Sequence, residues 1–165
     1  MPDSEGRGEG LREPFRIVFV CTGNTCRSPM AEAIARDRLA RRGWTHVEVT
    51  SAGTFGAAGA PAADDAIEVA REHGMDLTGH RSRALDAGEL ARADLILGMT
   101  LSHVQRALEM GAGERVALLG VLATGEERSV PDPIGQGLAT YRETWSVLSA
   151  WIDAALTRLE PLLSP

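Results

Sequence analysis

Cys21 and Arg27 are separated by five residues, within a short polar segment that contains glycine and asparagine. A loop of this length between a strand and a helix can turn its main-chain N–H groups inward and hold an anion, and the positive end of the following helix adds to the attraction. Gly23 permits a positive φ angle, and Asn24 tolerates one and can brace the loop with its side chain. The spacing therefore predicts a phosphate-binding loop made of Thr22, Gly23, Asn24, Thr25, Cys26, Arg27 and Ser28.

Cys21 is the expected nucleophile of this loop. A nearby helix N-terminus and a guanidinium group favour the thiolate form of a cysteine, which is the form that attacks. Ser28 can donate a hydrogen bond to that thiolate, and Arg27 can hold two phosphoryl oxygens in a bidentate fork that lysine does not offer. A thiolate beneath a cradled phosphate is placed for in-line attack. The alternative interpretation, that Cys21 is only a small buried residue, leaves this arrangement unexplained.

The leaving group needs a proton, and Asp132 is the candidate donor. Asp132 lies between Pro131 and Pro133, which stiffen its loop. That loop follows the fourth expected strand, so it reaches the sheet edge where ligands of parallel α/β folds bind. We expect Asp132 to protonate the leaving group and then to activate water against a phosphocysteine intermediate. An Asp-Pro pair alone indicates only a turn, so this assignment depends on the Cys21 loop.

The elements that must position these residues alternate along the chain. Short β-rich runs predict strands, and amphipathic stretches that end near glycine predict helices. The first helix is expected to have Ser28 as its N-cap and Pro29 as its first residue. The alternation predicts a single α/β domain: a four-stranded parallel sheet flanked by helices on both faces, with the phosphate-binding loop after strand 1. The expected strands are 15–20, 47–51, 94–99 and 116–119; the expected helices are 29–42, 61–73, 85–91, 101–110 and 138–163, with a loop over 121–137.

Length and composition limit the possible partners. A chain of 165 residues fits one domain, which we expect over 14–165, after a disordered tail over 1–13. A net charge of −6 gives no indication of nucleic-acid binding, and no apolar run approaches the ~20 residues of a membrane span. Two neighbouring cysteines and a polar N-terminal stretch indicate a reduced, cytoplasmic protein. No Cys/His pair downstream has zinc-ligand spacing, so neither a metal nor another cofactor is expected.

The motifs resemble the low-molecular-weight protein tyrosine phosphatase family. The resemblance rests on the stretch VCTGNTCRSPMAE at 20–32 and on Asp132-Pro133, with support from SAG at 51–53 and DLIL at 94–97. It covers about residues 15–160. It implies a cysteinyl-phosphate intermediate with Cys21 as nucleophile, Arg27 as phosphate clamp and Asp132 as general acid. It also implies phosphorylated proteins as substrates, and we expect a monomer or weak dimer.

Within that family, the sequence looks closest to the bacterial protein arginine phosphatase branch. Thr25 stands where tyrosine-specific members usually carry a bulkier aliphatic residue, and threonine suits the planar, polar guanidinium of phosphoarginine. Phe55 resembles a pocket wall of that branch, whereas Ile134 stands where the branch often has an aromatic residue. We therefore expect protein phosphoarginine as substrate, with Thr25, Phe55 and Ile134 setting selectivity, and phosphotyrosine as the alternative.

Two rival functions come from other classes. Arsenate reduction runs on related folds, but its thiol-relay versions typically need a further cysteine, and this chain has none after Cys26. An arsenate reductase coupled to an external thiol stays open. A non-catalytic phosphoprotein-binding module predicts loss of Cys21, Arg27 or Asp132, and all three are present.

The remaining candidates have a functional and a structural interpretation each. Cys26 can form a reversible, protective disulfide with Cys21, or it can be a small packed residue. His80 matches a family histidine that braces the active-site asparagine, although a loop histidine is more often solvated. At least one of Trp145 and Trp151 is expected in the core. The histidines expected at the surface are His46, His73 and His103.

Overall fold

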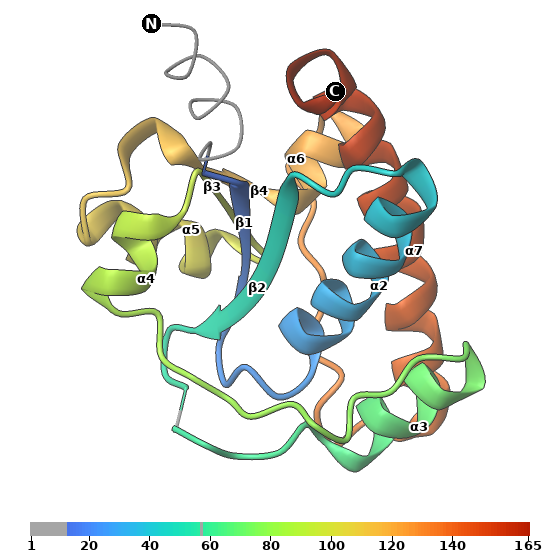
Figure 1. The fold of residues 1–165 in the computed structure, drawn as a ribbon. Coiled ribbons are helices and arrows are strands. Elements are labelled where there is room, and N and C mark those ends of the chain that lie inside the picture. The colour runs from blue at the N-terminus through green and yellow to red at the C-terminus, as the bar shows by residue number, and fades with distance from the viewer. Residues whose placement is uncertain (1–12, 57) are drawn as a thin grey trace, which may run out of the picture.

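Four parallel strands form one sheet in the order β2-β1-β3-β4 (Figure 1). The computed structural model describes residues 13–56 and 58–165, so the expected tail lies outside the described residues except for Glu13. The strands are β1 (Phe15–Cys21), β2 (Val47–Gly53), β3 (Leu95–Gly98) and β4 (Val116–Leu118). In the register, Cys21 lies opposite Gly53 and Val20 lies opposite Gly98. The predicted α/β architecture is confirmed, and the carboxyl end of β1 lies between those of β2 and β3.

Helices cover both faces of the sheet (Figure 1). Alternate residues of β1 supply the two cores: Ile17 and Phe19 pack with the larger helical layer, and Val18 and Val20 pack with the smaller one. Each such side chain contributes about 1.5–3 kcal/mol by leaving water. The larger layer contains α2 (Arg27–Arg42), α3 (Asp64–Glu72), α6 (Leu119–Thr124) and α7 (Leu138–Leu163); the smaller contains α4 (Ala87–Arg92) and α5 (Leu101–Glu109), and a 3₁₀ turn, η1, spans Gly113–Arg115.

Helix α2 begins two residues earlier than predicted. Its N-cap is Cys26, and its first helical residue is Arg27 rather than Pro29. Pro29 is the third helical residue, where an N–H group still has no partner within the helix, so the ring is tolerated. The Ser28 hydroxyl does not cap the helix because it bonds to Cys21 and Asn24 instead.

The expected loop over 121–137 is partly wrong, because α6 occupies Leu119–Thr124. Leu119 and Ala123 are buried, and Gly125 ends the helix with φ 78°. Six residues are too few to show a helical period in the sequence. Beyond α6, the Val130 N–H group donates to the carbonyl of Met99, just after β3, at 2.9 Å. This bond brings the following Asp132 to the carboxyl edge of the sheet.

The other helices differ from prediction mainly at their ends. Helix α3 begins at Asp64 instead of 61, and α4 begins after Asp86, whose carboxylate accepts from the Glu89 N–H group at 2.8 Å. Helix α7 has the predicted bounds, and Trp145 on it is buried as expected. In the part of the chain that the structure describes, no helix is long and apolar enough to cross a membrane.

Candidate active site

The loop between β1 and α2 holds its carbonyl groups outward. Four of its carbonyls accept hydrogen bonds from segments outside the loop, at 2.7–2.9 Å. In contrast, the N–H groups of residues 22–27 find no acceptor among the described residues. A peptide whose carbonyl points outward tends to present its N–H groups inward, which produces an anion-binding nest. The carbonyls and their donors are Cys21 with Thr54, Thr22 with Phe55, Asn24 with the His80 ring, and Thr25 with Ala63.

Asn24 is the internal brace of this loop. It is fully buried and has φ 57°, the left-handed conformation that asparagine tolerates. Its Oδ1 accepts from the Arg83 N–H group at 2.9 Å, and its Nδ2 donates to the hydroxyls of Ser28 and Ser51 at 2.8 and 2.9 Å. His80 also braces Asn24, as the family resemblance implied, but it does so through the main-chain carbonyl.

Gly53 lets the end of β2 approach the loop closely. A Cβ atom at this position would lie 2.5 Å from the Thr22 carbonyl oxygen and 3.0 Å from the Asn24 nitrogen. Both contacts are with main-chain atoms, which have little freedom to move aside. The absent side chain therefore sets the position of the loop against the sheet.

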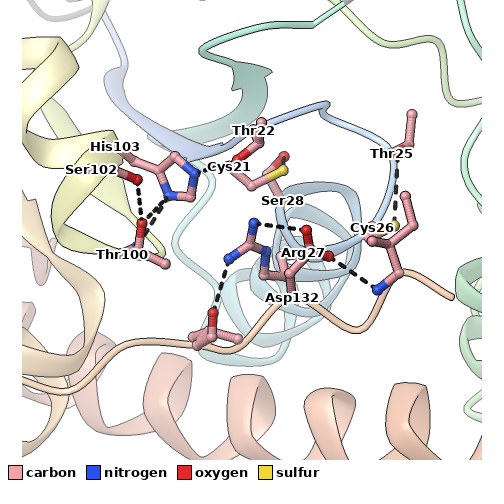
Figure 2. Close-up of polar contacts among 12 residues, drawn as sticks. Cys21, Thr22, Thr25, Cys26, Arg27, Ser28, Thr100, Ser102, His103 and Asp132 are labelled. Carbon is pink, nitrogen blue, oxygen red and sulfur yellow. Dashed lines mark hydrogen bonds and ion pairs between the residues drawn. The ribbon is translucent and has the colours of Figure 1, made fainter. Parts of the chain in front are cut away.

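The Cys21 thiol lies under the loop, 2.9 Å from the Ser28 hydroxyl oxygen (Figure 2). The direction of this bond follows from Asn24, whose Nδ2 can only donate and therefore makes the Ser28 oxygen an acceptor. The Ser28 proton is then free to be donated to the Cys21 sulfur. A donor at this place stabilises a thiolate, as the sequence predicted.

Arg27 carries a buried guanidinium group whose donors are only partly used by its neighbours. Its Nη1 donates to the Val130 carbonyl at 3.0 Å, and its Nη2 lies 3.6 Å from Oδ2 of Asp132 (Figure 2). Its Nε is buried and has no partner among the described residues. A buried donor without an acceptor costs about 1–3 kcal/mol, so this atom favours binding of an anionic oxygen.

Asp132 lies near the loop, and two exposed apolar residues are joined to this region by main-chain hydrogen bonds. Oδ1 of Asp132 accepts from the Ile134 N–H group at 3.1 Å, while Oδ2 faces Arg27. Phe55 is 83% exposed and Ile134 is 59% exposed. Phe55 is adjacent to the loop because its N–H group donates to the Thr22 carbonyl at 2.9 Å. Exposed apolar side chains next to an anion site are typical of a binding surface.

Comparison with known proteins identifies the family. The family model for low molecular weight phosphotyrosine protein phosphatases matches residues 16–161. The chain belongs to this family. It is therefore a cysteine-dependent protein phosphatase, acting on phosphoarginine or phosphotyrosine.

Relatives of the phosphatase fall in both substrate groups. It is 36% identical to a protein-arginine-phosphatase of Geobacillus stearothermophilus, over 89% of this chain and 97% of the relative. It is 34% identical to the low molecular weight protein-tyrosine-phosphatase Etp of Escherichia coli (strain K12), over 80% of this chain and 86% of the relative. The solved YwlE arginine phosphatase from Geobacillus stearothermophilus has a TM-score of 0.83 at 35% identity, over 90% of this chain and 95% of that one. Overall identity alone does not separate the two substrates.

The expectation that His103 of this phosphatase lies at the surface is wrong. Only 2% of the residue is exposed, and its Nε2 lies 2.9 Å from the Thr22 hydroxyl oxygen (Figure 2). Burial, and secondly the charge of Arg27, lower the pKa of His103 to about 4. His46 and His73 are exposed, as predicted. The position of His103 in the sequence is the one indication that it lies near the active site. Thr100 is the N-cap of α5, and His103 follows three residues later, at the same sheet edge as Cys21.

The sequence also gave no indication of the partner of Cys26 in the phosphatase. The Cys26 sulfur is buried and lies 3.1 Å from the Tyr141 hydroxyl oxygen on α7. Burial raises the pKa of the Cys26 thiol. Both cysteines are present as free thiols, and the disulfide between them stays a prediction. Among residues 13–56 and 58–165, no group of three or more His, Cys, Asp or Glu side chains is arranged to hold a metal ion.

Proposed function

We propose that this phosphatase hydrolyses phosphoarginine on proteins through a phosphocysteine formed at Cys21. The observation that carries the proposal is the pairing of a buried thiol with unsatisfied donors around it. The N–H groups of residues 22–27 and the Nε of Arg27 have no acceptor among the described residues. A phosphoryl group above the Cys21 sulfur would satisfy these donors and lie in line for attack.

The proposed reaction has two steps. In the first, the Cys21 thiolate attacks phosphorus, the bond from phosphorus to the substrate nitrogen breaks, and Asp132 gives its proton to that nitrogen. In the second, Asp132 takes a proton from water, the water oxygen attacks phosphorus, and the bond to sulfur breaks to release phosphate. Arg27 and the loop N–H groups stabilise the charge on the phosphoryl oxygens in both steps.

The residues at the mouth of the loop support phosphoarginine as the substrate. Thr25 offers a hydroxyl group where a larger aliphatic side chain would favour an aromatic ring. The exposed Phe55 can stack on a planar guanidinium group, and such contacts contribute about 0.5–1 kcal/mol at exposed sites. Ile134 adds an apolar wall on the Asp132 side. The arginine phosphatases among the similar proteins support the same choice.

The mechanism is tested by replacing each cysteine in turn. Cys21→Ser should abolish hydrolysis of every phosphorylated substrate while keeping phosphate binding, measured by calorimetry. Cys26→Ser is the matched control in the same loop and should keep substantial activity. Asp132→Asn should slow hydrolysis by about 10²–10⁴-fold, because general acid catalysis is lost. Full activity in Cys21→Ser would disprove the mechanism.

Substrate choice is tested with two peptides of the same sequence, one carrying phosphoarginine and one carrying phosphotyrosine. We expect a higher kcat/KM for the phosphoarginine peptide. Thr25→Ile should shift the ratio toward phosphotyrosine, and Thr25→Ser, which keeps the hydroxyl, should leave it near the wild-type value. A strong preference of the wild-type enzyme for phosphotyrosine would reject the arginine assignment.

A further inference from the structure

His103 links the end of β3 to the active-site loop, and its protonation pattern can be read from its neighbours. Its Nδ1 lies 3.1 Å from the Thr100 main-chain nitrogen, whose N–H group donates to it. A main-chain N–H group can only donate, so Nδ1 carries no proton. Nδ1 also lies 3.1 Å from the Thr100 hydroxyl, which can donate to the same lone pair.

The neutral ring must then carry its proton on Nε2. Nε2 faces the Thr22 hydroxyl oxygen at 2.9 Å, so His103 donates and Thr22 accepts. A doubly protonated ring would direct a second N–H group at the Thr100 N–H group. This clash agrees with the lowered pKa of His103, so the ring has the same form at neutral pH.

Thr22 is the part of the loop that faces outward. Its side chain is exposed, whereas Asn24, Cys26 and Arg27 are buried. A phosphoryl group held by inward N–H groups leaves the rest of the substrate against the exposed rim. Phe55 is also exposed, and its N–H group bonds to the Thr22 carbonyl, so the two residues adjoin each other. The exposed Thr22 side chain can therefore contact the part of a substrate that leaves phosphorus.

We propose that Thr22 is a specificity-determining residue whose hydroxyl oxygen accepts a hydrogen bond from the leaving guanidino group, and that His103 is the positioning residue that orients it. The inference rests on the proposed phosphoarginine activity. One lone pair of the Thr22 oxygen is engaged by His103, and the second is free for a substrate N–H group. Phosphotyrosine has no N–H group next to phosphorus, so the contact selects between the two substrates.

The first test compares Thr22→Val, which removes the hydroxyl at similar volume, with Thr22→Ser, which keeps it. For Thr22→Val we expect kcat/KM on the phosphoarginine peptide to fall about 5- to 100-fold, the range for loss of one hydrogen-bond partner. The phosphotyrosine value should fall by a smaller factor, so the ratio of the two kcat/KM values should drop in favour of phosphotyrosine. Thr22→Ser should keep the wild-type ratio of the two substrates.

The second test separates positioning from structural support through two variants of His103. A glutamine amide reaches the place of Nε2, so His103→Gln keeps a donor for Thr22. An asparagine amide reaches the place of Nδ1, so His103→Asn keeps only the acceptor for the Thr100 N–H group. We expect His103→Gln to keep the substrate ratio and His103→Asn to lose it. Adding Thr22→Val to His103→Asn should cause little further loss, because both act on one contact.

The outcomes distinguish this inference from the proposed function. A wild-type enzyme inactive on phosphoarginine would reject the proposed function. An active wild type whose substrate ratio survives Thr22→Val would reject only the role of Thr22. An equal fall in kcat/KM on both peptides in Thr22→Val, together with weaker inhibition by phosphate, would also reject the role of Thr22. That result would mean that the Thr22 side chain binds the phosphoryl group. The positioning role would be rejected if His103→Gln lost the wild-type preference for the phosphoarginine peptide while His103→Asn kept it.

Discussion

The Cys26 thiol and the Tyr141 hydroxyl lie 3.1 Å apart, which joins the active-site loop to the last helix. Burial is the main reason why the pKa of the Cys26 thiol is raised, and the Tyr141 hydroxyl acts in the opposite direction by donating to the thiolate. Burial likewise raises the pKa of Tyr141, so its hydroxyl keeps its proton and remains a donor. Tyr141 is therefore placed to favour the thiolate form of Cys26.

Tyr141→Phe should slow closure of the predicted Cys21–Cys26 disulfide after peroxide treatment. The variant removes a donor to the Cys26 thiolate, and a lost hydrogen bond of about 1 kcal/mol corresponds to roughly fivefold slower closure. Slower closure leaves more time for Cys21 to proceed to sulfinic acid. Timed peroxide exposure followed by non-reducing mass analysis measures both products. Equal or faster closure in Tyr141→Phe would contradict the role of Tyr141, and Cys26→Ser is the control that cannot close.

The lowered pKa of His103 predicts an acid-sensitive fold. The unfolded chain binds a proton at this histidine below about pH 6.5, whereas the folded chain does so only near pH 4. The free energy of unfolding should therefore fall as pH drops from 6.5 to 4, by on the order of 3 kcal/mol for a ring that is buried in the folded state. Urea unfolding at several pH values measures this slope. His103→Gln and His103→Asn should both have a shallower slope over the same interval, and an unchanged slope would contradict the assignment.

Asn24→Ala should be among the most damaging substitutions in the loop. It leaves the Arg83 N–H group and two buried hydroxyls without their partner, and it places alanine at φ 57°. We expect a loss of about 2–4 kcal/mol in the free energy of unfolding, together with weak phosphate binding. His80→Ala, which removes only the bond to the Asn24 carbonyl, should cost about 1 kcal/mol. Equal costs for the two variants, measured by urea unfolding, would be inconsistent with this ranking.

Gly53→Ala should displace the loop without touching any group that reacts. Its Cβ would meet the Thr22 carbonyl oxygen at 2.5 Å, so the main chain must shift, at a cost of about 1–3 kcal/mol. We expect kcat/KM to fall at least tenfold, because small displacements of a catalytic group are costly. Gly79→Ala is the matched control, since nothing lies within 4 Å of its Cβ position. Steady-state kinetics of both variants decide the matter, and wild-type activity in Gly53→Ala would refute the prediction.

The parts of the site that the sequence predicted are those with a local or topological signal. The loop from Cys21 to Ser28 is continuous in the chain, so its chemistry can be read directly. The position of Asp132 near the loop is predicted because the carboxyl ends of parallel strands lie at the same edge of a sheet. The contact of Cys26 with Tyr141 joins residues 115 positions apart, and no local pattern marks it. The burial of His103 depends on packing between β3, α5 and the loop, so the sequence does not indicate it. The predicted start of α2 lies two residues too far along the chain, because the loop itself supplies the first turn of the helix.

The outward carbonyls of the loop have a consequence for the enzyme when no substrate is bound. Their donors come from three segments far along the chain, so the cradle is complete before any substrate arrives. Free inorganic phosphate, the reaction product, fits the same cradle and occupies it without any cost of ordering. A hundredfold excess of phosphate over its dissociation constant would then add about 2.7 kcal/mol to the free energy of unfolding. The protein should behave as a phosphate-stabilised fold, whose melting temperature follows the concentration of its own product.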